Sequence, residues 1–148
     1  MDVFNEPTDW AWLAGLIDGE GSIQFKRSNK KLKGGEINSS YTAVVSIHMY
    51  SRESIARAAA IMDTSVRGYK NYDNTLWCTT SHGQKARRIL EIILPWLTAK
   101  RQEALLLLEA LACCPPQLGG RKHPLTSEDR AMRDGWYWTL RNAKKEVA

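Results

Sequence analysis

The stretch LAGLIDGEGSI, residues 13–23, decides the fold of this chain because a predicted helix changes into a predicted strand within it. Its leucines and first isoleucine have the spacing of one apolar helix face. Two carboxylates, Asp18 and Glu20, then stand among glycines at the C-terminal end of that helix. Acids are disfavoured there by the negative end of the helix macrodipole. A compensating cation or partner is therefore expected beside them.

A stripe of small residues lies on the other face of this predicted helix. Ala11, Gly15 and Gly19 fall at positions i, i+4 and i+8, which lets another backbone approach closely. Because the chain holds no second copy of the stripe, the simplest partner is the same helix of a second subunit in a two-fold dimer. The expected interface also includes Asp18. Such a dimer brings together the Asp18 and Glu20 carboxylates of two subunits, which repel unless cations are present.

Hard divalent cations prefer oxygen ligands, and Mg²⁺ often binds one or two carboxylates plus phosphate oxygens of a substrate. The two acids therefore predict a metal site at the end of the helix, with Glu20 as a ligand. A helix stop with solvated acids stays open as the default for an isolated Asp-Gly-Glu-Gly. An EF-hand loop is disfavoured, because its first and last ligand positions fall on Leu16 and Arg27.

The 148 residues suffice for one domain with a hydrophobic core, and a content of 43% hydrophobic and 25% charged residues is ordinary for a globular protein. We expect a single domain over residues 1–148, with a core over about 8–112 and a C-terminal helical extension over about 126–146. No apolar run is long enough to cross a membrane. The acidic N-terminus resembles neither a signal nor a transit peptide, and three cysteines without a C-x-x-C pattern indicate reduced thiols. An intracellular protein without membrane partner or structural zinc is expected.

The net charge of +5 is distributed unevenly along the chain. Residues 1–21 carry five acids and no base, residues 22–88 carry twelve bases and four acids, and residues 89–148 carry nine bases and seven acids. The middle of the chain, with a net charge of +8, is therefore the basic surface. A solvated face would also explain such an excess, so a second signal is needed before it indicates nucleic acid.

Hydrophobic periodicity predicts the order α-β-β-α-β-β-α, followed by C-terminal helices. Helices are expected over residues 7–18, 51–62, 84–94, 100–113 and from 126 onward. Strands are expected over residues 22–33, 41–49, 66–72 and 75–81, with Asp73-Asn74 as the turn of the second hairpin. This order predicts an α+β fold, in which helices cover one face of an antiparallel four-stranded sheet.

The uncovered face of such a sheet carries the polar side chains of each strand. Together with the basic loop after the first strand, they form the expected nucleic-acid surface: Gln24, Lys26, Ser28, Lys30, Lys31, Lys33, Thr42, Ser46, His48, Arg67, Tyr69, Asn71 and Thr79. Bases and hydrogen-bonding side chains of this kind contact phosphates and base edges. A solvated face without a ligand remains the alternative.

The opening motif also resembles the signature of a known family. LAGLIDGEG closely resembles the motif of the LAGLIDADG homing endonucleases, with identical letters at residues 13–18 and 21, while Gly19 and Glu20 replace Ala and Asp. One copy of the motif in a short chain is similar to the homodimeric branch of that family. The predicted order of helices and strands is similar to its saddle-shaped fold.

This resemblance implies a site-specific double-strand DNA endonuclease. Sheets of the family lie in the major groove of a long pseudo-palindromic site, and both strands are hydrolysed across the minor groove to leave short 3′ overhangs. Mg²⁺ is the implied cofactor; Mn²⁺ is expected to substitute for it, and Ca²⁺ to support binding without cleavage. No organic cofactor is expected.

Roles carry over from the family only at matching residues. The metal-binding acid, an assisting backbone carbonyl and the base beside the scissile phosphate correspond to Glu20, Gly19 and Lys100. A polar residue that organises water at the end of the second strand is also usual, but this position falls on Met49. His48, Arg52, or a site that works without such a group are the alternatives. A non-cleaving nucleic-acid binder of the same fold, an intron maturase or a transcription regulator, therefore stays open.

Overall fold

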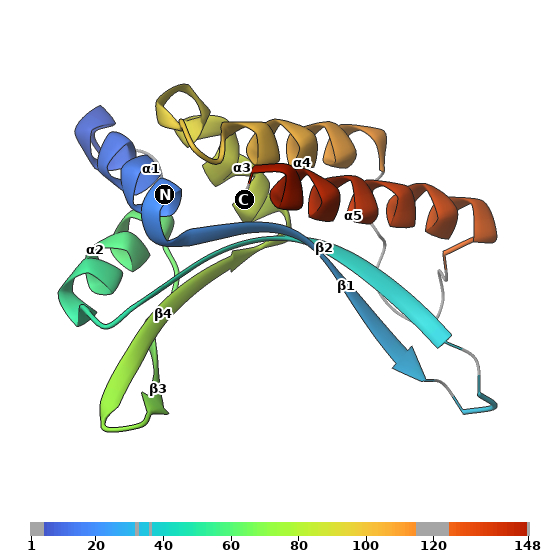
Figure 1. The fold of residues 1–148 in the computed structure, drawn as a ribbon, viewed down its shortest axis with the longest axis horizontal. Helices are drawn as coiled ribbons and strands as arrows, with labels where there is room; N and C mark the ends of the chain where they lie inside the picture. The colour runs from blue at the N-terminus through green and yellow to red at the C-terminus, as the bar shows by residue number, and fades with distance from the viewer. Residues whose placement is uncertain (1–4, 32, 36, 115–124, 148) are drawn as a thin grey trace.

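A curved antiparallel sheet with helices on one side organises the molecule (Figure 1). The computed structural model describes residues 5–31, 33–35, 37–114 and 125–147. Its strands are β1 (Gly21–Lys31), β2 (Ile37–Met49), β3 (Arg67–Asn71) and β4 (Asn74–His82), in the sheet order β1-β2-β4-β3. Its helices are α1 (Pro7–Glu20), α2 (Arg52–Met62), α3 (Gly83–Ile93), the 3-10 turn η2 (Leu94–Trp96), α4 (Arg101–Cys113) and α5 (Ser127–Val147). The predicted α+β class and four-stranded sheet are confirmed.

Helix α1 begins and ends at residues suited to those positions. Glu6 and Asp9 form a reciprocal capping box at its start, and Pro7 occupies the first turn. The helix continues two residues beyond the predicted end, so that Glu20 is its last residue. Gly21 follows at once as the first residue of β1, where a Cβ would lie 2.7 Å from the Ile17 Cα. Only glycine therefore allows the chain to turn from α1 into β1 without a clash.

The hydrophobic core lies between the sheet and the helices. On β1, Ile23 and Phe25 are buried whereas Gln24 and Lys26 are exposed, which is the period-two pattern of a strand covered on one face. The C-terminal helix is part of this packing, because Leu140 of α5 belongs to the same core cluster. Within the described residues, no helix is long and apolar enough to span a lipid bilayer.

The two hairpins extend beyond the helical layer as arms (Figure 1). They leave a concave sheet face between them that none of the described helices covers (Figure 1). The turn of the second hairpin differs from the prediction by one residue: Asn71 pairs with Asn74, so the turn is Tyr72-Asp73, with Tyr72 at a φ of 56°. Prediction of Asp73-Asn74 was wrong because ladder register, and not only local turn preference, decides which residues turn.

Candidate nucleic-acid interface

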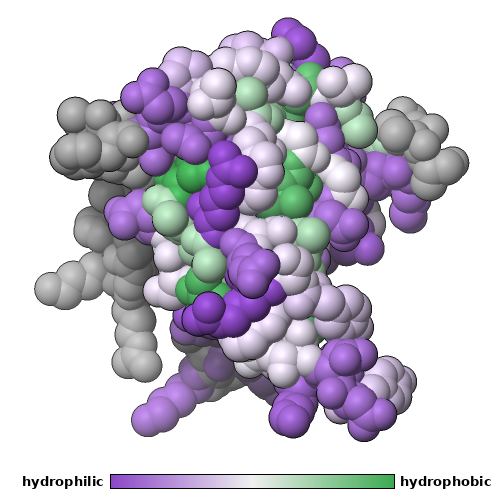
Figure 2. Space-filling model, turned by 90° about the vertical axis from the view of Figure 1, so that its left-hand side faces the viewer, coloured by the Kyte–Doolittle hydropathy of each residue, from purple (hydrophilic) through white to green (hydrophobic). Residues whose placement is uncertain are grey.

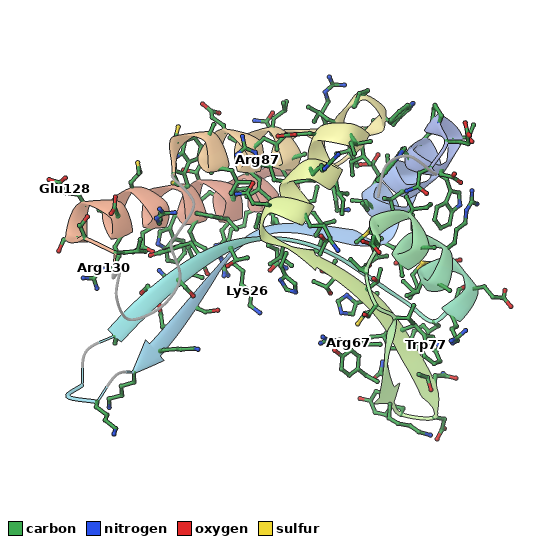
Figure 3. All side chains as sticks on the ribbon, turned by 180° about the vertical axis from the view of Figure 1, so that it is seen from behind. Lys26, Arg67, Trp77, Arg87, Glu128 and Arg130 are labelled. Carbon is green, nitrogen blue, oxygen red and sulfur yellow. The ribbon has the colours of Figure 1, made fainter. Side chains whose placement is uncertain are left out.

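Cross-strand pairing fixes which side chains share the concave face, because paired residues point to the same side of a sheet. Most of the predicted surface lies there: Gln24, Lys26, Ser28, Lys30, Thr42, Ser46, His48, Arg67, Tyr69 and Asn71. Lys26 and Arg67 project into the concavity from the two arms (Figure 3). Between the arms the face is hollowed by about 600 Å³, lined by residues that include Gln24, His48 and Arg67.

Two of the predicted residues lie on the other side of the sheet. Thr79 pairs with Ile47, is 1% exposed, and hydrogen bonds through its hydroxyl to that of Thr64. Its neighbour Thr80 takes the open position instead, a residue that the sequence did not single out. Because two adjacent threonines are identical, the alternation of buried and exposed residues does not show which one faces the core. Only the strand pairing distinguishes them. Lys31 likewise points away from the face that Lys30 shares, because successive strand residues alternate.

Two residues remain to be placed relative to the open face: Lys33, which was predicted, and Val44, which was not. Lys33 is exposed in the turn after β1, where no strand pairing assigns it to a face. Val44 lies on the open face opposite Gln24. Its side chain is only 6% exposed, and an apolar residue on that face gave no signal in a search for polar ones.

Asp18, one of the two acids at the C-terminal end of α1, finds hydrogen-bond donors within its own chain. The Asp18 carboxylate accepts hydrogen bonds from the backbone N–H groups of Thr98, at 2.8 Å, and Lys100, at 2.9 Å. These donors stand at the start of α4, where unpaired N–H groups and the positive dipole end favour a carboxylate. Asp18 thus has two hydrogen-bond donors within its own subunit, while its place in a dimer interface stays a prediction. Its charge stabilises the start of another helix.

The same contact brings Lys100 to the end of α1. The Lys100 side chain also points toward α1, and its Nζ donates a hydrogen bond to the Asp18 carbonyl at 2.7 Å. Lys100 is half-buried and precedes the first residue of α4. The structure thus places two of the predicted site residues, Glu20 and Lys100, at one helix terminus. Their proximity could not be read from residues 80 positions apart.

Glu20 remains available for a ligand. Its side chain is exposed and forms no hydrogen bond or ion pair with any described residue. The carbonyl of Gly19 belongs to the last turn of α1, whose C=O groups lack helical partners. Carboxylate and carbonyl oxygens are the donors that Mg²⁺ prefers. In the described parts of the chain, however, no three His, Cys, Asp or Glu side chains are grouped to hold a metal, so these donors fit Mg²⁺ only with ligands from outside one subunit.

The small-residue stripe of α1 faces outward. Gly15 and Gly19 are exposed, and a Cβ at either position would meet no atom within 4 Å. Ala11 on the same stripe is partly exposed. The side of the molecule that carries α1 and α2 mixes apolar patches with strongly polar ones (Figure 2). A second helix therefore has room to approach α1 along this stripe.

The remaining candidates, His48 and Arg52, do not come together. His48 points to the concave face, whereas Met49 is partly buried against the core and pairs with Trp77. Arg52 stacks on the Trp77 ring, 5.2 Å from its centroid. Trp77 pairs with Gly68, the neighbour of Arg67, so it points to the side of the hairpin opposite Arg67. The β2–β4 ladder is regular through His48, so no bulge turns this histidine toward Met49.

Comparison with known proteins recovers this fold. No family model and no curated protein matches the sequence. Among solved structures, the homing endonuclease I-CvuI in complex with its target in the presence of Ca is 18% identical, with 95% of each chain covered and a TM-score of 0.59. The homing endonuclease I-TnaI is 17% identical, covering 97% of this chain and 99% of that chain, with a TM-score of 0.57.

An archaeal intron-encoded homing endonuclease, I-Vdi141I complexed with DNA, gives a similar result. It is 16% identical, covers 89% of this chain and 98% of that chain, and has a TM-score of 0.55. The LAGLIDADG homing endonuclease I-GzeII, also solved with a DNA target, matches 90% of this chain with 43% of its own. The resemblance in the motif is thus confirmed at the level of the fold: this chain has the fold of the LAGLIDADG homing endonucleases.

Proposed function

We propose that this protein is a site-specific double-strand DNA endonuclease that works as a homodimer and uses a divalent metal. One observation carries the proposal. The hydrogen bonds between Asp18 and the start of α4 hold Lys100 beside the end of α1, where the exposed Glu20 has no partner among the described residues. A carboxylate that could bind a metal and an ammonium group that could neutralise a phosphate, both at the edge of a basic concave sheet, are the groups that hydrolysis of a phosphodiester requires.

The concave face is the proposed DNA-binding surface. Strand β1 has 11 residues, or ~36 Å at ~3.3 Å per residue, which spans about ten base pairs at ~3.4 Å each. A dimer would then contact about 20 base pairs of a pseudo-palindromic site, since target symmetry mirrors protein symmetry. Lys26, Lys30 and Arg67 would supply contacts to phosphates or guanines from the major groove.

In the proposed dimer the stripe Ala11, Gly15 and Gly19 packs against its copy, and two Glu20 carboxylates approach one another. Mg²⁺ or Mn²⁺ bound by Glu20 would supply Lewis-acid activation of a water and stabilise the leaving oxygen. Lys100, fixed by its hydrogen bond to the Asp18 carbonyl, would neutralise charge that develops on the phosphate. Two such sites related by the dimer axis would cut both strands, and the family resemblance implies that they do so across the minor groove and leave short 3′ overhangs.

A second candidate function has its own support. Met49 falls at the end of the second strand, where the resemblance implies a polar residue that organises water, and its side chain packs against the core. His48 and Arg52 do not replace it in a common location. This absence favours a non-cleaving DNA- or RNA-binding protein of the same fold, a maturase or a transcription regulator, in which α1 and Lys100 have only structural roles.

Cleavage of a plasmid library of pseudo-palindromic sites distinguishes the two functions. In Mg²⁺ or Mn²⁺ the wild type is expected to linearise a subset of plasmids, whereas in Ca²⁺ it should bind them without cutting. Glu20→Gln keeps the size of the side chain but removes its charge, so it should bind in a gel shift and lose nearly all cleavage. Glu53→Gln, an exposed acid in the first turn of α2, is the matched control and should cut normally.

The outcomes separate clearly. Equal cutting by Glu20→Gln and wild type would place the metal elsewhere. Selective binding by the wild type without cleavage in any of these metals would favour the non-cleaving function. Binding that does not weaken by orders of magnitude between low and moderate salt would contradict the assignment of the concave face to phosphate contacts.

A further inference from the structure

A basic pocket opens at the free edge of the sheet, between β1 and the C-terminal half of α5. Strand β1 is an edge strand, and the end of α5 lies over its first residues (Figure 1). The pocket has a volume of about 480 Å³, and its polar lining includes Gln24, Lys26, Arg27, Arg141, Lys144 and Lys145. We call it the β1–α5 pocket. None of these residues except Gln24 and Lys26 was part of the predicted DNA surface.

Most of the cations in the β1–α5 pocket form no close ion pair with a described residue. Arg27 is neutralised by an ion pair with Asp134 at 3.0 Å. Among the side chains that the structure describes, Lys26, Arg141, Lys144 and Lys145 form no ion pair. The negative end of the α5 macrodipole offers only about half an elementary charge. The pocket therefore keeps a large excess of positive charge.

Burial disfavours the charged form of one of these cations, Lys144. Lys144 is half-buried, and the pKa of its ammonium group is lowered, first by burial and then by the charges of Lys100 and Arg141, with Glu103 opposing them. The influence of Lys100 and Glu103 on Lys144 reflects the packing of the end of α5 beside the start of α4. The pocket is thus electrostatically linked to Lys100 of the proposed cleavage site.

Arg141 is held in position before any ligand arrives. It donates a hydrogen bond to the Tyr137 hydroxyl at 2.7 Å and stacks on the rings of Tyr137 and Trp138, 5.5 and 5.8 Å from their centroids. The Arg27 guanidinium stacks on the same two rings. A guanidinium fixed in this way loses little freedom when its planar fork binds two oxygens of an anion.

We propose that the β1–α5 pocket binds a phosphate group, and that in the DNA complex this group is a backbone phosphate flanking the cleaved one. The second half of this assignment rests on the proposed function. Gln24 is four residues after Glu20 along the chain, so the two lie ~13 Å apart along β1 at ~3.3 Å per residue. A DNA strand whose scissile phosphate lies at Glu20 therefore reaches the pocket within a few nucleotides. By this contact α5 would fix the strand that Lys100 faces.

The first experiment uses inorganic pyrophosphate as the probe and needs no DNA. Titration of the wild type, followed by the NMR signal of the Trp138 indole N–H, is expected to give a saturable shift. The double variant Arg141→Ala/Lys144→Ala should weaken this binding at least tenfold. Lys144→Gln and Lys145→Ala are milder variants in case the double variant fails to fold. Arg87→Ala is the control, because Arg87 lies in the helical layer away from the concave face (Figure 3).

The second experiment measures the salt dependence of binding to a random 30-base-pair duplex. Loss of one phosphate contact lowers the slope of log Kd against log salt by about 0.9 per subunit, and the pocket variants should show this loss while Arg87→Ala does not. Pyrophosphate binding without a change in slope would retain the phosphate site but exclude DNA as its source. Pyrophosphate binding by a wild type that does not bind DNA would overturn the proposed function and leave the pocket intact. No pyrophosphate binding and an unchanged slope would overturn the inference.

Discussion

Replacing Asp18 by alanine tests the link between α1 and α4 most directly. The substitution removes the acceptor of two backbone hydrogen bonds, from Thr98 and Lys100, and leaves both N–H groups at the start of α4 without their partner. Alanine has a higher helix propensity than aspartate and carries no charge at the negative end of α1. Both changes favour α1, so a net loss of stability reports the lost cap.

The magnitude follows from the two bonds. Hydrogen bonds to a charged group contribute about 1.5–3 kcal/mol each, and loss of one capping side chain costs about 0.5–2 kcal/mol. Asp18 is half-exposed, so water partly replaces it, and we expect a loss of about 2–3 kcal/mol in the free energy of unfolding. At ~2–4 °C per kcal/mol for a chain of this size, the melting temperature should fall by roughly 5–10 °C.

Urea denaturation followed by far-UV circular dichroism provides the measurement. Asp18→Asn keeps one acceptor oxygen, so it should lose about half as much stability as Asp18→Ala. Asp73→Ala is the control, because Asp73 is exposed in the hairpin turn and its loss should change stability by less than about 0.5 kcal/mol. An Asp18→Ala value as small as the control value would refute the capping role.

The same variant separates capping from cleavage. If Asp18 positions Lys100, Asp18→Ala should reduce the single-turnover cleavage rate more than tenfold while DNA affinity stays nearly constant. Adding Lys100→Ala to Asp18→Ala should then cost little more, because coupled residues are not additive. Additive losses of the two substitutions would show that they act independently.

Three further predictions concern other parts of the fold. Gly21→Ala should destabilise the protein by about 1–3 kcal/mol in urea denaturation, because its Cβ would lie 2.7 Å from the Ile17 Cα; an unchanged midpoint would contradict this clash. Gly15→Leu should keep the far-UV circular dichroism spectrum of a folded subunit, since a Cβ there meets open space, but shift sedimentation from dimer to monomer. A dimer retained by this variant would place the interface elsewhere. The pKa of Tyr41 is raised to about 12, first by burial and then by its hydrogen bond to Asp134, so its stabilising contribution is complete below the unfolded value near 10 and is lost as pH rises through 12. Tyr41→Phe should therefore remove the latest tyrosinate absorbance transition, and persistence of that transition would assign it to another tyrosine.

Local patterns predicted much of this structure. The apolar spacing before Asp18 gave α1, and the alternation around Ile23 and Phe25 gave β1, because both elements bury one face at a regular period. The order of strands and helices followed from such periods along the chain. Residues of the concave face could be assigned wherever the alternation had a clear phase, as at Gln24 and Lys26.

Long-range contacts explain what sequence reasoning missed. The partner of Asp18 lies 80 positions away at Thr98, and no period connects the two. The choice between Thr79 and Thr80 depends on pairing with β2, which neighbouring identical residues cannot reveal. The β1–α5 pocket likewise depends on how the last helix packs over the first strand.

The alternation along β1 has an evolutionary consequence. Its inward residues Ile23 and Phe25 hold the strand against the helices, whereas Gln24, Lys26 and Ser28 project from the concave face. Substitutions at outward, exposed positions typically alter stability by less than ~0.5 kcal/mol. If the concave face binds DNA as proposed, a lineage carrying this sheet can change its preferred target through a few successive substitutions, each nearly neutral for folding, while the core and the α1 terminus stay untouched.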